Sequence, residues 1–252
     1  MTEPYRAESW LIFTEDSVVS TQKWVRERLS SIPDRSVVLA GSQTAGRGRS
    51  GREWQSPAGG FYASFLLKPS PPIHFAPCVS LYAAAVLARL LRRNSIQAFI
   101  KWPNDVIVGG KKIAGIIAEA GSFPESWLVL GIGVNLTETP FVPNRKFLQA
   151  GSWGEFGSPP SPVTLLKNFL REFDSGWKNR ADNPLESVSA DLREILWCSG
   201  KPVTLTAGTE TIHGIISRVD TCGSLVMITE SGERSFISGE LLTAPGEGGE
   251  NV

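Results

Sequence analysis

Short apolar or alternating segments, separated by turn-forming residues, predict a series of β-strands in the first half of the chain. These segments lie at residues 11–13, 36–40, 61–67, 98–100, 106–108, 113–120 and 127–134. The last of them is apolar at almost every position, as expected for a strand covered on both faces. The glycine pair at 109–110 joins two of the segments and predicts a β-hairpin.

Longer segments with apolar residues on one side predict α-helices. They lie at residues 20–32, 77–94, 166–177 and 184–197. Pro33 ends the first of them, because proline cannot continue a helix. Between residues 137 and 162 the chain is rich in Pro, Gly and Ser and has no clear period, which is typical of a lid or cover over a site.

After Gly200 the pattern changes to short strand-like segments separated by turns. The segments at residues 203–205, 211–219, 225–229 and 234–237 predict a small SH3-like β-barrel. We therefore expect an α+β fold, with a mixed sheet and helices in residues 1–199. The barrel follows in residues 200–245, and residues 246–252 are expected to form a disordered tail.

The composition indicates a globular chain with a substantial core, since 41% of the 252 residues are hydrophobic. The 25 Lys and Arg residues balance 25 Asp and Glu residues, so no overall field draws the chain onto nucleic acid or a membrane. Any anion recognition must therefore be local. The N-terminus lacks the pattern of a signal peptide, and no apolar run approaches about 20 residues, so we expect a cytoplasmic protein.

The cysteines and histidines do not support a disulfide framework, a zinc site or histidine-based catalysis. Cys78, Cys198 and Cys222 are odd in number and far apart in the sequence. His74 and His213 make no metal-ligand pair with each other or with these cysteines. Neither histidine has the surroundings of a catalytic triad.

The most polar candidate site is the segment GSQTAGRGRSGREWQSPAGG at residues 41–60. Glycines allow backbone N–H groups to approach an anion, and arginines add paired donors. Gly46, Gly48 and Gly51 form G-x-G-x-x-G, but this segment leads into a strand, whereas a dinucleotide fingerprint opens a helix. A Walker loop is excluded because its Lys-Ser/Thr pair is missing, and no HRD or DFG motif of a kinase follows. An anion-binding loop and a solvated surface loop remain open.

Further polar residues cluster at the ends of predicted elements. Lys101, Asn104 and Asp105 lie at the entrance of the predicted hairpin, and Lys112 lies at its exit. Asn135 ends a buried strand and is therefore a site candidate. At the junction of the first strand and helix, Ser-Thr-Gln at residues 20–22 can cap the helix or hydrogen-bond a small ligand.

Four features in one order resemble the biotin protein ligase family. They are SQTAGRGRSGREWQSPAGG (42–60), KWPNDVIVGGKKIAGIIAE (101–119), LGIGVNL (130–136) and the small terminal barrel. The resemblance implies a mixed α/β catalytic domain related to class II synthetases, followed by an SH3-like domain. Since the chain enters the catalytic domain within about ten residues, it resembles the monofunctional form of the family, without a DNA-binding domain or nucleic-acid partner.

The resemblance implies a two-step reaction with biotin, ATP and Mg²⁺. The biotin carboxylate attacks the α-phosphate of ATP to give biotinyl-5′-AMP and pyrophosphate. A lysine of a biotin carboxyl carrier protein then takes the biotinyl group. A cluster of cations suits the first step, because it brings two anions together.

Site residues follow from the resemblance by motif. It implies biotin contacts from Ser20, Thr21, Gln22, Gln43, Gly46, Arg47, Arg49, Lys112 and Gly115. It implies nucleotide contacts from Arg47, Arg49, Arg52, Trp54, Asn104, Lys112 and Asn135. It implies catalytic roles for Lys112, Arg47, Arg49 and Asp105.

Individual positions refine these expectations. Lys112, directly before Ile-Ala-Gly, matches the lysine that contacts the biotin carboxyl group and the phosphate, whereas Lys111 is expected to be a solvated turn residue. Magnesium is expected to arrive with ATP, near Asp105, and no metal site made of protein groups alone is implied. Gln22 stands where the family usually has Asn, so this contact departs from the family pattern.

Two alternatives of different classes remain. A lipoate or octanoate ligase or transferase shares the catalytic fold and a lysine-containing site, although the GRGRSGR and KWPND strings favour biotin. A non-catalytic biotin or nucleotide sensor would not require so much cationic charge. An exposed strand edge could pair with the carrier or form a homodimer.

Overall fold

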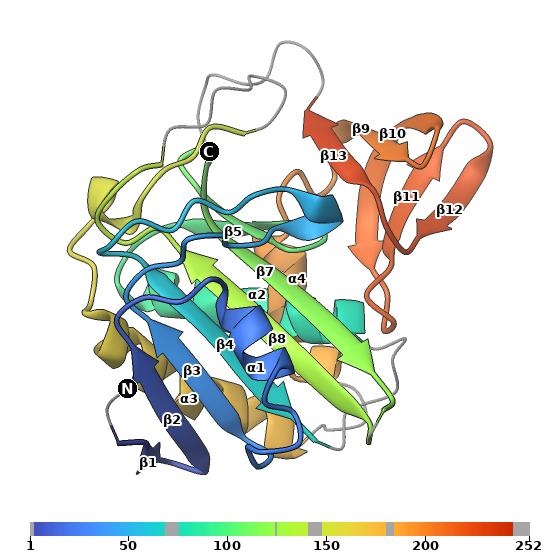
Figure 1. Ribbon diagram of the computed structural model, residues 1–252. Coiled ribbons are helices and arrows are strands. Elements are labelled where there is room, and N and C mark those ends of the chain that lie inside the picture. Colours follow the sequence, from blue (N-terminus) through green and yellow to red (C-terminus); the bar gives the residue numbers. More distant parts are fainter. Residues whose placement is uncertain (1–2, 69–75, 124, 141–147, 180–183, 244–252) are drawn as a thin grey trace.

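The computed structural model describes residues 3–68, 76–123, 125–140, 148–179 and 184–243. These residues form an eight-stranded mixed sheet with helices on its faces and a separate five-stranded sheet (Figure 1). The predicted mixed α+β fold is therefore confirmed. No helix in the described ranges is long and apolar enough to cross a membrane.

The larger sheet has the order β1-β2-β3-β4-β8-β7-β6-β5. Its strands are β1 Tyr5–Ala7, β2 Trp10–Glu15, β3 Ser36–Ala40, β4 Phe61–Leu67, β5 Ala98–Lys101, β6 Asp105–Val108, β7 Lys111–Gly121 and β8 Trp127–Val134. Among the pairs that these described strands form with one another, only β2–β3 is parallel. The sequence missed β1, a short exposed strand without an apolar pattern. The predicted hairpin of β6 and β7 is confirmed.

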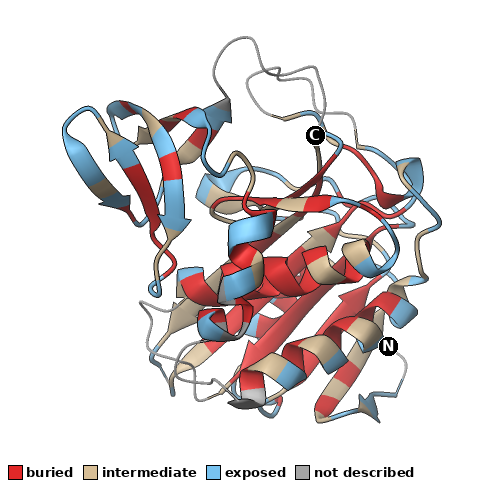
Figure 2. Cartoon of the chain, turned by 180° about the vertical axis from the view of Figure 1, so that it is seen from behind, coloured by how far each residue is buried: buried red, intermediate tan, exposed pale blue. Residues whose placement is uncertain are grey.

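Helices cover both faces of this sheet. They are α1 Thr21–Arg26, α2 Ala76–Arg93, α3 Pro162–Asn179 and α4 Ser189–Ile195, with short 3₁₀ turns η1 Arg49–Gly51, η3 Trp153–Glu155 and η4 Pro184–Val188. The helices α2 and α3 lie together on one face, whose inner side chains are buried (Figure 2). The helix α1 lies on the other face, against β3, β4 and β8.

Two of the predicted helices have the wrong extent. The first ends at Arg26 rather than at residue 32, because bonds such as Arg28 N to Val25 O tighten the chain into turns. The predicted helix 184–197 is divided into η4 and α4, because Val188 has a non-helical backbone (φ −124°, ψ 6°).

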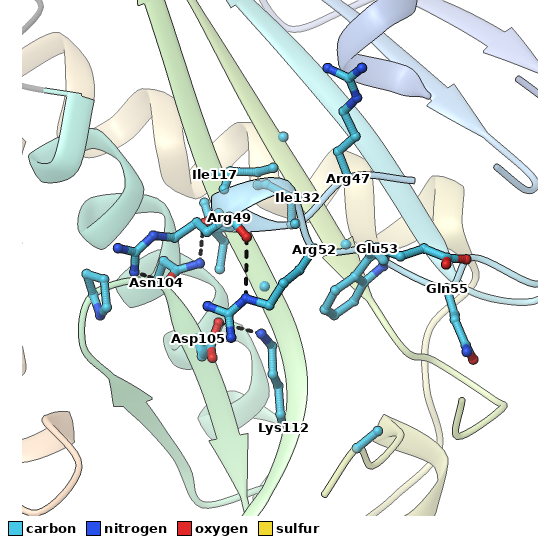
Figure 3. Close-up of a pocket in the computed structure, with 18 of the residues that line it drawn as sticks. Arg47, Arg49, Arg52, Glu53, Gln55, Asn104, Asp105, Lys112, Ile117 and Ile132 are labelled. Atoms are coloured by element: carbon cyan, nitrogen blue, oxygen red, sulfur yellow. Dashed lines mark hydrogen bonds and ion pairs between the residues drawn. The ribbon is translucent and has the colours of Figure 1, made fainter. Parts of the chain in front are cut away.

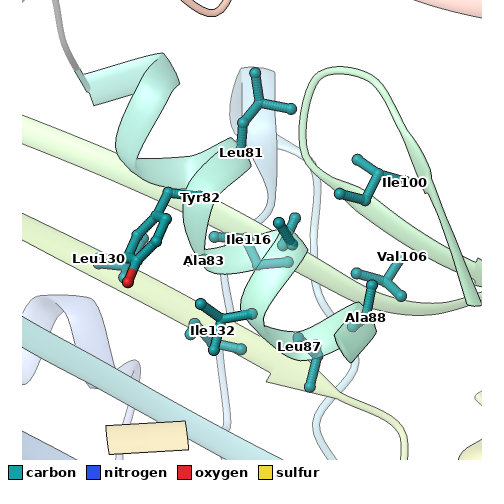
Figure 4. Packing of buried hydrophobic residues seen from close by; sticks show 14 of the residues in the cluster. Leu81, Tyr82, Ala83, Leu87, Ala88, Ile100, Val106, Ile116, Leu130 and Ile132 are labelled. Atoms are coloured by element: carbon teal, nitrogen blue, oxygen red, sulfur yellow. The ribbon is translucent and has the colours of Figure 1, made fainter. Parts of the chain in front are cut away.

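The two faces of the sheet are built from alternating residues. In β8, Leu128, Leu130 and Ile132 belong to the core under α2 and α3, whereas Val129 packs on the α1 side. Successive side chains of a strand point to opposite faces, so one strand contributes to both clusters. Figure 4 shows Tyr82 of α2 beside Leu130, and Leu87 of the same helix on the side of Ile132 away from Leu130.

The smaller sheet is antiparallel and has the order β12-β11-β10-β9-β13. Its strands are β9 Pro202–Ala207, β10 Glu210–Val219, β11 Leu225–Thr229, β12 Gly232–Phe236 and β13 Glu240–Thr243. The sequence missed β13, which pairs with β9. A hydrogen bond from Trp102 Nε1 to Gly223 O, 2.9 Å, joins the β5–β6 turn of the larger sheet to the β10–β11 turn of the smaller one.

Several sequence-based expectations concern residues outside the described ranges. These are His74, the part of the proposed lid at residues 141–147, and the tail at 246–252. The SH3-like character of the smaller sheet and the boundary at residue 200 stay predictions.

A buried carboxylate ties α3 to the start of the larger sheet. Asp174 is 5% exposed and accepts hydrogen bonds from Ser9 Oγ (2.6 Å), Trp10 Nε1 (3.1 Å) and Arg35 Nη1 (2.6 Å). Three donors satisfy the carboxylate, and one of them neutralises its charge. Loss of Asp174 would leave a buried indole N–H and a guanidinium without their acceptor.

We therefore expect Asp174→Ala to lower the free energy of unfolding by about 2–4 kcal/mol, because the substitution leaves buried donors without their carboxylate acceptor. Urea denaturation measures this change. The matched control is Glu172→Ala on the same helix, which removes a pair with the exposed Arg93 and should cost about 1 kcal/mol or less. Equal losses in the two variants would contradict the structural role of Asp174.

Candidate functional site

A cavity of about 410 Å³ lies on the α1 face of the larger sheet. Its walls come from the N-terminus of α1, the glycine-rich segment, the β5–β6 turn, strands β7 and β8, and the start of β13 (Figure 3). Elements far apart in the sequence therefore meet at one site. Residues from both sheets line it, since Gly239, Glu240 and Leu241 belong to its wall.

Glycines at alternate positions of β7 and β8 make the floor of the cavity. A Cβ atom on Gly131 would lie 2.9 Å from Cδ of Gln22, and one on Gly133 would lie 2.5 Å from Nε1 of Trp54. At Gly115 the distance to the Trp54 ring would be 3.1 Å. Because any side chain here would displace its neighbours, the floor needs residues without a Cβ.

Trp54 forms one wall over this floor. Its ring lies against Gly115 and Gly133, and Nζ of Lys112 lies 5.3 Å from the ring centroid, within cation–π range. The indole N–H is buried and finds no hydrogen-bond partner among the described residues. The ring thus has a packing role here, and base stacking stays a prediction.

A chain of hydrogen bonds fixes the polar end of the cavity. Ser64 Oγ donates to Thr21 Oγ1 (2.8 Å), and Gln43 Oε1 accepts from both Thr21 N (2.8 Å) and Thr21 Oγ1 (3.1 Å). The Gln43 amide in turn donates to Ser56 Oγ, 2.8 Å. Ser20 caps α1 by accepting from Lys23 N. These bonds set the orientation of Thr21 and Gln43 before any ligand arrives.

Gln22 completes this end in a different way. It is 4% exposed, and its Nε2 has no hydrogen-bond partner in the described ranges. A buried amide N–H without an acceptor is costly, so this donor is available for a ligand group. The side chain lines the cavity beside Gly131.

The glycine-rich segment forms a hairpin between β3 and β4, which confirms its predicted position between two strands. Bridges pair Gln43 with Ser56 and Arg47 with Glu53, and the chain turns through η1. At the base, Tyr62 Oη donates to Pro57 O, 2.8 Å.

Close packing makes glycine necessary at Gly46. A Cβ there would lie 2.4 Å from Trp54 O and 2.7 Å from Ser56 Oγ. Gly46 itself lies outside the set of residues that line the cavity.

The tip of this hairpin is held against the β5–β6 turn. Arg49 Nη1 donates to Asn104 Oδ1 (3.0 Å), and Asn104 Nδ2 donates to Ile116 O (2.9 Å). Burial lowers the pKa of the Arg49 guanidinium, and the Asp105 carboxylate opposes that shift. Arg52 Nη1 also reaches Glu240 Oε1 on the smaller sheet, 3.4 Å away.

Lys112 and Asp105 form the ion pair at the centre of the site. Nζ of Lys112 lies 2.7 Å from Asp105 Oδ1, at an angle outside hydrogen-bond geometry. The side chain of the neighbouring Lys111 instead pairs with Glu155, and both side chains are partly exposed. Only Lys112 of the two lines the cavity.

Asn135 connects the end of β8 to the segment before η3. Its Nδ2 donates to Gly151 O (2.9 Å), and its backbone O accepts from Trp153 N (2.8 Å). Asn135 is buried and lines the cavity. These hydrogen bonds therefore fix the position of the segment that forms this wall of the cavity.

The structure brings together every residue expected at the site except Gly46. Those lining the cavity are Ser20, Thr21, Gln22, Gln43, Arg47, Arg49, Arg52, Trp54, Asn104, Asp105, Lys112, Gly115 and Asn135. The Arg47 side chain is exposed and points away from Lys112 and Asp105 (Figure 3). Its assigned contacts with biotin and phosphate stay predictions.

The sequence did not assign several of the lining residues to the site, among them Lys101, Gly131, Gly133 and Glu240. It also missed Ser56, which accepts a hydrogen bond from Gln43. The alternating glycines of LGIGV signal a small-residue face, because positions two apart share one side of a strand. Lys101 opens the KWPND string, and the sequence indicates only that it lies at the entrance of the hairpin. Glu240 has no local signal, because its partner Arg52 is 188 positions away.

No group of three or more Asp, Glu, His or Cys side chains in the described ranges is arranged to hold a metal ion. Asp105 pairs with Lys112 and Glu240 with Arg52, and both carboxylates border the cavity. The residues present therefore fit a magnesium ion that comes with a phosphate ligand better than one held by the protein alone.

Comparison with known families agrees with this geometry. The model described as the biotin/lipoate A/B protein ligase family matches residues 15–135. The model described as the biotin protein ligase C terminal domain matches residues 198–241. The two matches cover strands β3 to β8 of the larger sheet and most of the smaller sheet.

Relatives and solved structures resemble most of the chain. It is 32% identical to the biotin–acetyl-CoA-carboxylase ligase of Paracoccus denitrificans, over 81% of this chain and 88% of that one. It is 29% identical to the bifunctional ligase/repressor BirA of Bacillus subtilis, over 90% of this chain and 72% of that one. The biotin protein ligase of Aquifex aeolicus, solved with biotin and ATP, superposes with a TM-score of 0.75 at 26% identity, covering 92% and 97% of the two chains. The chain therefore belongs to the biotin protein ligase family.

Proposed function

We propose that this protein activates biotin with ATP and transfers the biotinyl group to a lysine of a biotin carrier domain. The observation that carries the proposal is one cavity with a hydrogen-bonding end at Thr21 and Gln43 and a cationic end at Lys112 and Arg49. Biotin has the matching ends, a ureido ring and a carboxylate. The glycine floor leaves space between them.

The polar end suits the ureido ring, which offers two N–H donors and a carbonyl acceptor. Gln43 and Thr21 are held by the hydrogen bonds to Ser56 and Ser64, so they meet the ring in a fixed orientation. The free N–H of Gln22 supplies a further donor. Gln in place of the usual Asn places this donor farther from α1, directly over Gly131.

The cationic end suits the first chemical step. A carboxylate oxygen of biotin forms a bond to the α-phosphorus, and the bond between that phosphorus and the oxygen leading to the β-phosphate breaks. Pyrophosphate leaves with the electron pair. Lys112 and Arg49 offset the repulsion between the two anions and the charge that develops on the phosphate oxygens.

Magnesium enters as part of the MgATP substrate. When bound, it neutralises charge on the phosphates that leave. We propose that Asp105 is the carboxylate beside this ion, because it borders the cavity and is fixed by Lys112.

In the second step the amine of a carrier lysine attacks the carbonyl carbon of biotinyl-5′-AMP, and the bond from that carbon to the phosphate oxygen breaks, releasing AMP. We propose that Asp105 and Asn104 orient the incoming amine. The glycine-rich hairpin covers the adenylate and limits its hydrolysis. The contacts of Arg49 and Arg52 at its tip support this role.

We further propose residues 1–199 as the catalytic unit and 200–245 as an SH3-like unit, in a cytoplasmic protein with no nucleic-acid partner. The outer edge of β5 is partly covered, because Trp197 N donates to Ile100 O (2.9 Å). The exposed edge strand β1 is therefore the candidate for pairing with the carrier or with a second copy of the chain.

Biotin, MgATP and an isolated biotin carrier domain, incubated with this protein, should give a carrier labelled on its target lysine, as measured by mass spectrometry. Lipoate should give no labelled lipoyl domain under the same conditions, because the polar end of the cavity matches a ureido ring. Transfer of lipoate without transfer of biotin would contradict the proposed substrate.

Lys112→Ala should lower kcat/KM for adenylate formation by about 10²–10³-fold and weaken biotin binding much less, because the contact strengthens in the transition state. Pyrophosphate release and calorimetric biotin titration measure the two effects. The control is Lys111→Ala, which removes a neighbouring lysine that points to Glu155. Equal losses of affinity and rate would exclude the transition-state role.

Arg49→Ala should accelerate release of biotinyl-5′-AMP by about tenfold or more, because it removes a charge-assisted bond at the hairpin tip. Stopped-flow measurement with labelled adenylate tests this. Arg26→Ala, which removes an exposed pair with Glu119 outside the hairpin, is the matched control. Unchanged release in Arg49→Ala would show that this contact does not keep the hairpin closed.

A further inference from the structure

Lys101 is a buried lysine on the wall of the cavity. It is the last residue of β5, lies opposite Asp105 in the β5–β6 pair and is 7% exposed. Its side chain lines the same space as Lys112 and Arg52. Neither step of the proposed reaction uses this residue.

The other cations around Lys101 have partners. Lys112 pairs with Asp105, Arg49 with Asn104, and Arg52 with Glu240. For the Lys101 ammonium, the structure gives no hydrogen-bond or ion-pair partner among the residues that it describes. The side chain is largely buried, but Nζ keeps some accessible surface and Lys101 lines the cavity, so this unpaired ammonium is available to an anion that enters the cavity.

Charges from several elements surround this ammonium. Burial lowers the pKa of Lys101, Asp105 and Glu240 oppose this shift, and Lys112 and Arg52 add to it. Lys101 is thus within electrostatic range of two cations that border the cavity. Three positive groups around one space fit a ligand with several negative charges better than a single carboxylate.

We propose that Lys101 contacts the β- and γ-phosphates of ATP and stabilises the pyrophosphate that leaves in the first step. This inference rests on the proposed function. Lys112 is assigned to the α-phosphate, and Lys101 supplies charge where the departing phosphates gain it. An ammonium donates three hydrogen bonds and accepts none, so it binds phosphate rather than taking a proton from the carrier amine.

The decisive variant is Lys101→Met, which keeps the length of the side chain and removes its charge. If the charge serves only the ligand, the ligand-free protein should keep or raise its melting temperature, because an unpaired buried charge is removed. The kcat/KM for ATP in adenylate formation should fall by about 10²-fold. Biotin affinity, and transfer from preformed biotinyl-5′-AMP to the carrier, should stay within about twofold of wild type.

Two further variants sharpen the test. Lys101→Arg should recover part of the ATP kcat/KM, because a guanidinium also pairs with phosphate. Lys111→Met is the matched control and should leave adenylate formation unchanged, since Lys111 points away from the cavity.

The outcomes separate this inference from the proposed function. If the wild-type protein forms no biotinyl-5′-AMP, the proposed function itself fails. If the wild type is active and Lys101→Met keeps its ATP kcat/KM, the phosphate contact is wrong. A lower melting temperature with equal loss of rate in adenylate formation and carrier transfer would show that Lys101 has a structural role. Loss of carrier transfer alone would assign Lys101 to the second step. Either result would overturn the inference.

Discussion

The site depends on a strand that builds a core on one face and leaves space on the other. In β8 the residues under α2 and α3 are Leu128, Leu130 and Ile132, whereas Gly131 and Gly133 face the cavity. Larger residues at these two positions would meet Gln22 and Trp54. Because successive side chains of a β-strand point to opposite faces, alternate positions of β8 serve the core and the cavity within one segment of sequence.

The second constraint is electrostatic. A site that joins a carboxylate to a triphosphate must hold cations close together before the ligands arrive. Each of three cations has a polar partner: Asp105 for Lys112, Asn104 for Arg49 and Glu240 for Arg52. The two carboxylates reduce repulsion between the cations, and all three partners fix cation positions, so less reorganisation is needed during the reaction.

Much of this arrangement could be predicted from the sequence, because it follows local patterns. The alternation in residues 61–67 and the apolar run 127–134 correspond to β4 and β8, and the glycine-rich segment lies between antiparallel strands as expected. The length of α1 could not be predicted, because turn-type bonds after Arg26 keep Ile32 buried without a helix. The strand β13 is too short for a clear pattern, and its Glu240 meets Arg52 only through the tertiary fold. The KWPND string marks Lys101 in the sequence. That its side chain is buried and has no described partner depends on the tertiary packing around the cavity.

The hairpin over the cavity is held differently at its two ends. Its base is fixed by the Gln43–Ser56 bridge, by the Tyr62–Pro57 hydrogen bond and by the absence of space at Gly46. Its tip is held by two polar contacts of arginine side chains, with Asn104 and Glu240. Opening can therefore break the tip contacts and leave the hairpin's own backbone bonds intact, at a cost of about 1–3 kcal/mol. If the hairpin closes over the site as we propose, it would therefore move as a preformed unit that needs no refolding at each turnover. Salt would favour the open position, because it screens the Arg52–Glu240 pair.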